Sequence, residues 1–149
     1  MQIYVDADAC PVKEEAAKVA VRHNLIIHYV SNSHMRLPFG DNVKRVVVSD
    51  GPDAADNWIA EQAQAGDVVI TADIPLASRA IKKGAKVIAH NGKPFSEDSI
   101  GMALAMRDLM SQLRETGDVR GNNSVFTPAD RSRFLQGLEN TIQALKRAG

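Results

Sequence analysis

The stretch QIYVDADACPVKEEAAKVAVRHNLIIHYV, residues 2–30, decides the fold because it predicts a strand, a helix and a second strand in succession. Residues 3–5 are apolar and form the first short strand. Pro11 suits the first turn of a helix, and apolar residues then recur at helical spacing as far as about His23. Residues 25–30 predict the second strand. A helix that joins two neighbouring strands is typical of a parallel sheet.

The rest of the chain continues this alternation. Strands are predicted over residues 43–48, 67–71 and 86–89, and helices over 53–66, 74–83, 97–117 and 128–147. We therefore predict a three-layer α/β/α fold of the Rossmann-like kind, with a mainly parallel sheet of about five strands and two C-terminal helices. Residues 1–149 are expected to form one domain, with the sheet core in residues 1–89. The apolar stripe of the last helix needs a partner, in this chain or in a homodimer.

Composition excludes several classes of protein. The 149 residues carry 18 Lys plus Arg against 18 Asp plus Glu, so no overall basic field exists to hold nucleic acid. Any nucleic-acid binding must therefore come from a local patch, and because aromatic residues make up 5% of the chain and form no series that would stack bases, its sequence preference should be weak. Cys10 is the single cysteine, which excludes an intrachain disulfide, and no apolar run is long enough to span a bilayer. We expect a cytoplasmic protein without a membrane segment.

Five aspartates lie where predicted strands meet helices: Asp6, Asp8, Asp53, Asp56 and Asp73. The carboxyl ends of parallel strands open onto one crevice, so acids that are distant in sequence are expected to become neighbours there. Clustered carboxylates repel one another unless a cation or shared protons neutralise them. Because Mg2+ and Mn2+ prefer oxygen ligands, the pattern predicts a divalent-metal site that holds Mg2+ or Mn2+.

Each candidate residue also has a purely structural explanation. Asp53 suits a helix N-cap, a role that requires no further function. Cys10 is better explained as a small buried residue than as a nucleophile, since no histidine lies nearby in sequence. Four basic residues fall in loops or on the helix after Asp73, where they would rim the crevice and bind substrate phosphates: Arg36, Arg79, Lys82 and Lys93. For each of these four, a solvated surface position is the alternative.

The whole chain resembles the YaiI/YqxD family of uncharacterised bacterial proteins. The resemblance rests on VDADACPVK (5–13), SDGPDAADNWI (49–59), TADIPLASRAI (71–81), HNGKPF (90–95) and DRSRFLQGLE (130–139). These motifs extend from one end of the chain to the other. The resemblance implies no substrate.

Residues 1–89 also resemble a PIN-type domain, the fold of a class of metal-dependent ribonucleases and related nucleases. VDADA places Asp6 at the acid that ends the first strand, and DNWIAEQAQAGDVVITAD (56–73) places Asp56 and Asp73 at two later acids. This resemblance implies that these three residues are catalytic and bind the metal ions, assisted by Asp8 and Asp53. The implied substrate is RNA or single-stranded nucleic acid.

This chain departs from the PIN pattern in its middle. PIN domains usually carry extra helices with another acid between the first strand and the later aspartates, and the chain is too short there. Asp8, Asp50 or Asp53 would have to substitute for that acid.

Two alternatives to a nuclease remain. VDADAC is similar to the Asp-x-Asp motif of haloacid-dehalogenase-like phosphatases, which would make Asp6 a nucleophile, Asp8 a general acid and Thr71 a phosphate ligand. The chain departs from that family because Pro11 starts a helix at once, with no flexible insertion. The other alternative is a non-catalytic module that binds metal or nucleic acid. The strand-end placement of the acids favours the nuclease.

Overall fold

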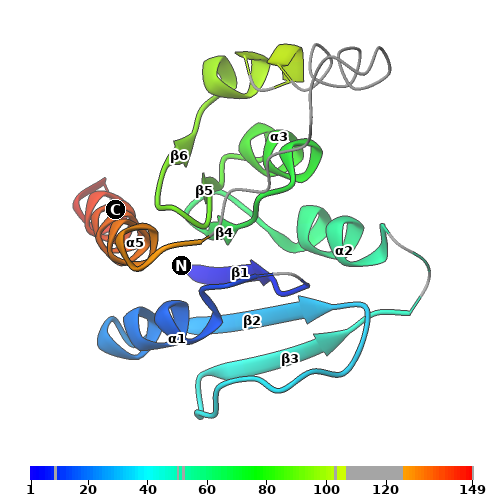
Figure 1. The fold of residues 1–149 in the computed structure, drawn as a ribbon, viewed down its shortest axis with the longest axis vertical. Coiled ribbons are helices and arrows are strands. Elements are labelled where there is room, and N and C mark those ends of the chain that lie inside the picture. The colour runs from blue at the N-terminus through cyan, green and yellow to red at the C-terminus, as the bar shows by residue number, and fades with distance from the viewer. Residues whose placement is uncertain (9, 50, 52, 103, 107–125, 149) are drawn as a thin grey trace.

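The computed structural model describes residues 1–8, 10–49, 51, 53–102, 104–106 and 126–148 (Figure 1). Its strands are β1 (Gln2–Asp6), β2 (Ile26–Ser31), β3 (Val43–Val47), β4 (Val68–Ile70), β5 (Lys86–Ile88) and β6 (Pro94–Phe95). Its helices are α1 (Lys13–Arg22), α2 (Ala54–Gln62), α3 (Ile74–Lys82) and α5 (Pro128–Ala148). Residues 97–102 and 104–106 are also helical.

The strands form one sheet in the order β3-β2-β1-β4-β5-β6. The first five strands are parallel, and β6 pairs antiparallel with β5. The predicted α/β fold with a mainly parallel sheet is therefore confirmed. The sixth strand was not predicted, because two residues are too few to show the alternation that identifies a strand.

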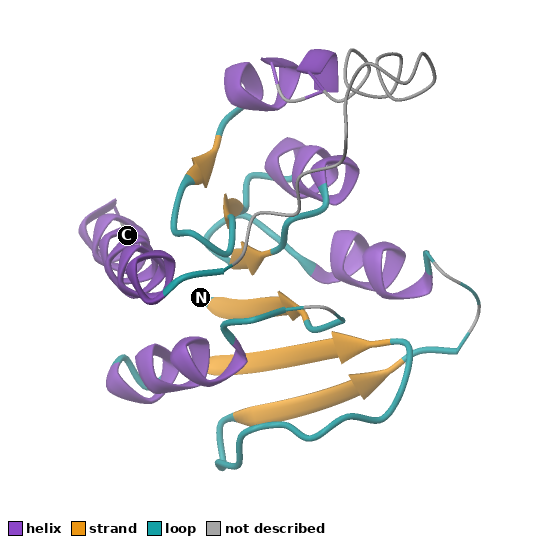
Figure 2. Ribbon diagram, viewed as in Figure 1, coloured by secondary structure: helices purple, strands orange, loops and turns teal. Residues whose placement is uncertain are grey.

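The two faces of the sheet are covered by different helices, as Figure 2 shows in outline. Ile3 and Val5 of β1 point to the face covered by α1 and α5, where they join one hydrophobic core. Tyr4 points to the opposite face, where α2 and α3 enclose a second core. This alternation is the period of two expected of a strand, and it gives the predicted three layers.

The chain changes direction across the sheet after β3. From β1 it builds outward through α1 to β2 and then β3, and α2 returns it to β4 on the other side of β1. β1 and β4 therefore flank a topological switch point. In open α/β sheets, ligands bind outside the carboxyl ends of the strands at such a point.

Some helix boundaries differ from the prediction. α2 ends at Gln62 rather than near residue 66, because Ala63 turns to an extended conformation with a ψ of 138°. The predicted helix over 97–117 is helical over its described residues 97–102 and 104–106, and the remainder lies outside the described part. α5 begins with a capping box, in which Asp130 N–H donates to Thr127 Oγ1 and Thr127 N–H donates to Asp130 Oδ2.

The apolar stripe of α5 finds its partner within this chain. Phe134, Leu138 and Ile142 are fully buried in the core beneath α1 and α5. The stripe therefore no longer argues for a homodimer, although a dimer on another surface stays a prediction. Within the described residues, no helix combines the length and the apolar character needed to cross a membrane.

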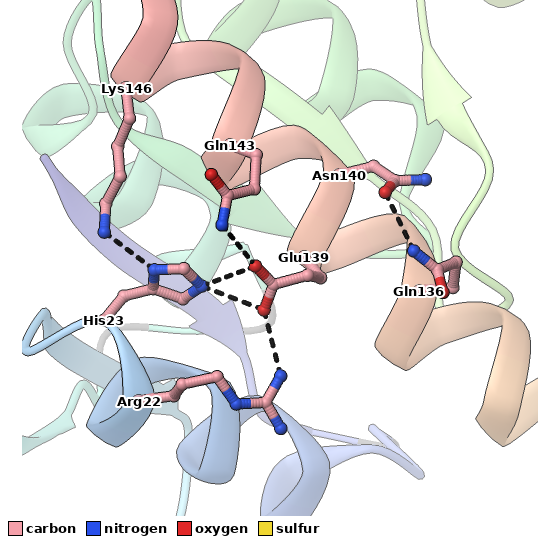
Figure 3. A network of polar contacts seen from close by, with 7 residues as sticks. All are labelled: Arg22, His23, Gln136, Glu139, Asn140, Gln143 and Lys146. Atoms are coloured by element: carbon pink, nitrogen blue, oxygen red, sulfur yellow. Dashed lines mark hydrogen bonds and ion pairs between the residues drawn. The ribbon is translucent and has the colours of Figure 1, made fainter.

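A polar network fastens α5 to the end of α1 (Figure 3). Glu139 accepts hydrogen bonds from His23 Nε2 at 2.8 Å and from Arg22 Nη1 at 3.0 Å. Lys146 Nζ can only donate and lies 2.7 Å from His23 Nδ1, so Nδ1 accepts and the ring hydrogen is on Nε2. Hydrogen bonds from His23, Gln143 and Arg22 lower the pKa of Glu139 to about 2.

Two glycines allow α5 to approach the turn after β5. Gly92 has a φ of 83°, in the left-handed region that favours glycine. A Cβ atom at Gly137 would overlap the backbone of Gly92, and a Cβ at Gly92 would overlap the backbone of α5 at Arg133. Side chains at either position would force the helix away from the sheet.

We predict that Gly137→Ala destabilises the protein by about 1–3 kcal/mol, because the added methyl group is forced into the backbone of Gly92. Gly101→Ala is the matched control, since Gly101 is helical and has open space around its Cβ position. This control should be neutral or raise the free energy of unfolding by up to about 1 kcal/mol. Urea unfolding measures both, and a stabilising effect at Gly137 would contradict the close packing.

Because the pKa of Glu139 is low, part of the free energy of unfolding depends on pH. A carboxylate with a depressed pKa stabilises the fold above its ordinary value of 4.5, and that contribution disappears as the pH falls toward 2. Glu139→Gln should therefore cost on the order of 1 kcal/mol at pH 7, since Glu139 is partly buried against His23 while Arg22 is exposed, and much less near pH 2. Glu97→Gln, at an exposed helical residue, should show no such difference. Urea unfolding at several pH values is the measurement.

Candidate functional site

Thr71 joins the ends of β1 and β4 across the switch point. Its Oγ1 donates to Oδ2 of Asp6, the last residue of β1, at 3.0 Å. The same oxygen accepts from the backbone N–H of Asp73 at 3.0 Å. Thr71 is fully buried, so both bonds lie away from water. This hydroxyl therefore fixes the Asp6 carboxylate relative to the start of α3.

Asp73 is the N-cap of α3. Its backbone is extended, and its Oδ1 accepts a hydrogen bond from Leu76 N–H at 2.8 Å. Asp53 occupies the corresponding position before α2, but its side chain makes no capping hydrogen bond. Asp53 is therefore the N-cap residue of α2, as predicted, but it lacks the side-chain capping bond that Asp73 makes at the start of α3.

Asp56 lies in the first turn of α2, where the negative charges of the neighbouring aspartates act on its carboxylate. Burial raises the pKa of Asp56 to about 6, helped by the negative charges of Asp73, Asp6 and Asp53 and opposed by Arg79. Burial also raises the pKa of Asp6, against the hydrogen bond from Thr71, and the charges of Asp73 and Asp8 add to the rise. The structure thus brings Asp6, Asp56 and Asp73 within electrostatic reach of one another.

Asp8 and Asp53 lie at the margin of this group. Oδ2 of Asp8 accepts from the backbone N–H of Asn32 at 2.9 Å, which ties the turn after β1 to the loop after β2. Asp53 is exposed. Asp8 therefore has a structural role, and Asp53 is linked to the group through its charge on Asp56.

The donors suit a hard divalent cation in kind, since all are carboxylate oxygens. Asp6 and Asp73 each use one oxygen in the hydrogen bonds to Thr71 and Leu76, which leaves each a second oxygen. Within the residues that the structure places, however, no three His, Cys, Asp or Glu side chains are gathered closely enough to hold a metal ion. Carboxylate oxygens are suitable ligands for Mg2+ or Mn2+, but in this structure these side chains are not close enough together to form a complete metal site.

Of the predicted basic residues, Arg79 lies beside the acids. Its charge lowers the pKa of Asp56, and its Nη1 donates to Asn57 Oδ1 at 2.7 Å. Lys82 lies at the opposite end of α3 from Asp73. Arg36 and Lys93 are exposed in the segments that follow β2 and β5. Substrate binding by any of the four stays a prediction.

Two further polar residues lie near this edge of the sheet. His90 follows β5, and its Nε2 is buried without a hydrogen-bond partner in the described residues. Burial and the charge of Lys13 lower the pKa of His90. Cys10 is buried, and burial raises its pKa to about 11, so it is a neutral thiol as expected of a structural residue. The burial of His90 Nε2 depends on packing and could not be predicted from the sequence.

We predict that Asp56 titrates near pH 6, as followed by carboxyl NMR signals. A raised folded pKa means that Asp56 favours the folded state below its ordinary value of 3.8 and loses this effect as the pH rises through about 6. Asp56→Asn should then raise the free energy of unfolding at pH 8, on the order of 1 kcal/mol after solvent screening. Asp73→Asn should move the Asp56 pKa back down, and an unchanged pKa would contradict the coupling.

Comparisons with known proteins agree with the residues quoted above. The family model described as "Uncharacterized BCR, YaiI/YqxD family" matches residues 4–144. A UPF0178 protein of Parvibaculum lavamentivorans is 62% identical over 146 residues, which cover 98% of this chain and 96% of the relative. One of Rhodospirillum rubrum is 61% identical over 148 residues, which cover 99% of each chain. No solved structure matches the chain. The chain therefore belongs to the YaiI/YqxD family of uncharacterised bacterial proteins.

Proposed function

We propose that the protein is a divalent-metal-dependent nuclease that cleaves phosphodiester bonds of RNA or other single-stranded nucleic acid. The observation that supports this most directly is the hydrogen bond from Thr71 to Asp6. It holds a strand-end carboxylate at the switch point, where the charges of Asp56 and Asp73 act on the same space.

The uncompensated negative charge around Asp56 is the second observation that supports a metal-dependent nuclease. The pKa of Asp56 is raised partly because three other carboxylates act on it, and Arg79 is the cation that opposes them. A divalent cation would relieve this repulsion. Asp6, Asp56 and Asp73 would hold it, with Asp8 and Asp53 adjusting them directly or through water. When bound, the ion would activate a water molecule and stabilise charge on the phosphoryl oxygens.

The residues of the chain have separate roles in this scheme. Thr71 orients Asp6, and the helix cap orients Asp73, so neither carboxylate has to be ordered when the substrate arrives. Arg79, whose charge already acts on Asp56, would attract a substrate phosphate toward the acids. With no protein nucleophile required, the buried Cys10 thiol has no part in the reaction.

The resemblance to PIN-type domains supports the same function. The chain departs from that domain type between the first strand and the later aspartates, and the structure is also short there. Between β1 and α2, the described residues form α1, β2 and β3, without the extra helices of that domain type. Asp8 and Asp53 are the nearby acids that would replace the missing carboxylate. Asp50, the third residue considered for this role, lies outside the described residues.

The proposal predicts cleavage of single-stranded RNA or DNA that requires Mn2+ or Mg2+. Asp73→Asn should lower this activity by roughly 10–100-fold or more, because it removes one carboxylate of the cation site. Asparagine caps a helix about as well as aspartate, so this variant should stay folded. Asp41→Asn is the matched control, since Asp41 is exposed in the turn before β3, at the amino end of that strand. It should retain full activity.

Other outcomes would replace the proposal. Turnover of a small phosphate monoester alone, abolished by Asp6→Asn, would identify a phosphatase with Asp6 as nucleophile. Divalent-metal binding with no turnover of polynucleotide or monoester would identify a non-catalytic binding module. Equal cleavage by Asp73→Asn and the unsubstituted protein would remove Asp73 from the site.

A further inference from the structure

A cavity of about 730 Å³ opens at the amino-terminal edge of the sheet, at the opposite end of β1 from the acids. Gln2, Tyr4, His28 and Lys44 line it from three adjacent strands, and Trp58 and Gln62 line it from α2. This volume lies within the range of small-molecule sites. Gln2 and Asp6 are four residues apart in β1, or about 13 Å, so this site is separate from the carboxylates.

Three aromatic rings meet in this cavity. Tyr4 and His28 are direct partners in the pairing of β1 with β2, and their rings stack with centroids 4.7 Å apart and planes within 8°. Trp58 is tilted against both, with centroids 6.0 Å and 6.1 Å away. His28 and Trp58 are only partly buried, so part of their ring surface faces the cavity. A planar aromatic ligand would find stacking partners here.

The His28 ring is held in a fixed orientation. Its Nε2 lies within hydrogen-bond distance of Gln2 Oε1, and the Tyr4 hydroxyl donates to the same oxygen at 3.4 Å. Because Gln2 Oε1 can only accept, Nε2 carries the hydrogen. Burial lowers the pKa of His28, which keeps the ring neutral at physiological pH. His28 thus presents a stacking surface rather than a charge.

A cation lies next to the aromatic wall. Lys44 is the partner of His28 in the pairing of β2 with β3, so the two side chains stand side by side on the same face. Lys44 is exposed. Asp67 is the acid that lines the cavity, and its two oxygens already accept from the backbone N–H groups of Gln2 and Gln64 at 3.0 Å. The cavity therefore combines an aromatic surface with two exposed cations, Lys44 and Arg45, and, among the described residues, the single carboxylate of Asp67.

We propose that this cavity binds a nucleotide, with its base against the partly exposed rings of His28 and Trp58 and its phosphate at Lys44, while the buried Tyr4 ring supports His28 from behind. Base stacking on aromatic side chains tolerates any base, and a lysine binds phosphate as a point charge. The nucleotide is either free or one unit of a single-stranded nucleic acid, and both present the same base and phosphate. This site does not depend on the acids, so it stands whether or not the nuclease proposal holds.

Trp58 is the only tryptophan of the chain, so its fluorescence reports on this cavity directly. The intact protein would be titrated in EDTA with AMP, UMP, adenosine, ribose 5-phosphate and a four-nucleotide RNA. We expect saturable quenching by the nucleotides or by the RNA, and none by ribose 5-phosphate. Lys44→Ala should weaken nucleotide or RNA binding roughly tenfold, the loss of one charge-assisted contact, and leave any adenosine binding unchanged.

Lys18→Ala is the matched control, since Lys18 is an exposed residue of α1 on the other side of the sheet, and it should change nothing. His28→Ala should weaken both nucleotide and adenosine binding, measured by calorimetry on a variant whose thermal unfolding confirms folding. Binding of RNA but not of AMP or UMP, weakened in Lys44→Ala, would support the site and assign it to nucleic acid.

Absence of saturable binding by every base-containing probe would overturn the proposal. So would equal binding of ribose 5-phosphate and AMP, or equal effects of Lys44→Ala and Lys18→Ala. Asp73→Asn should leave these titrations unchanged, which separates failure of this site from failure of the nuclease proposal.

Discussion

The structure depends on the burial of β1 between β2 and β4. Ile3 and Val5 are fully buried on one face and Tyr4 is buried on the other, so the central strand contributes to both hydrophobic cores. Parallel pairing on both sides then fixes the direction of every neighbouring strand. The two ends of β1 become two different chemical environments, with carboxylates at Asp6 and an aromatic and basic cavity at Gln2.

Much of the fold could be predicted because it follows from local patterns. Short apolar runs and helical spacing located β1 to β5 and the helices, and the helix predicted over 128–147 matches α5. The side-chain caps of α2 and α3 could not be told apart in this way, because an aspartate precedes each helix. Asp73 has the extended backbone of a cap, with a ψ of 114°, whereas Asp53 has a ψ of 4°. Only the folded chain sets those angles.

The acid group and the aromatic cavity differ in how far they can be predicted from the sequence. The carboxyl ends of parallel strands open onto one crevice, and this rule was enough to predict that Asp6, Asp56 and Asp73 lie near one another. The rule needs only the order of strands and helices. The aromatic cavity depends on register, because Tyr4 meets His28 only when β1 and β2 pair residue for residue. The hydrogen bond from Thr71 to Asp6 likewise forms only because β4 lies beside β1. Neither pairing leaves a signal in the linear sequence.

The position of α5 has a consequence for synthesis on the ribosome. Phe134, Leu138 and Ile142 complete the core over Ile3 and Val5, yet the ribosome makes them long after the strand that they cover. A growing chain can pair β1 with β2 early, but the part of this apolar face that α1 leaves uncovered stays open to water until α5 leaves the exit tunnel. Contacts this distant in sequence slow folding. A chain that stops before α5 would therefore expose the part of this hydrophobic face that α5 covers, which favours aggregation.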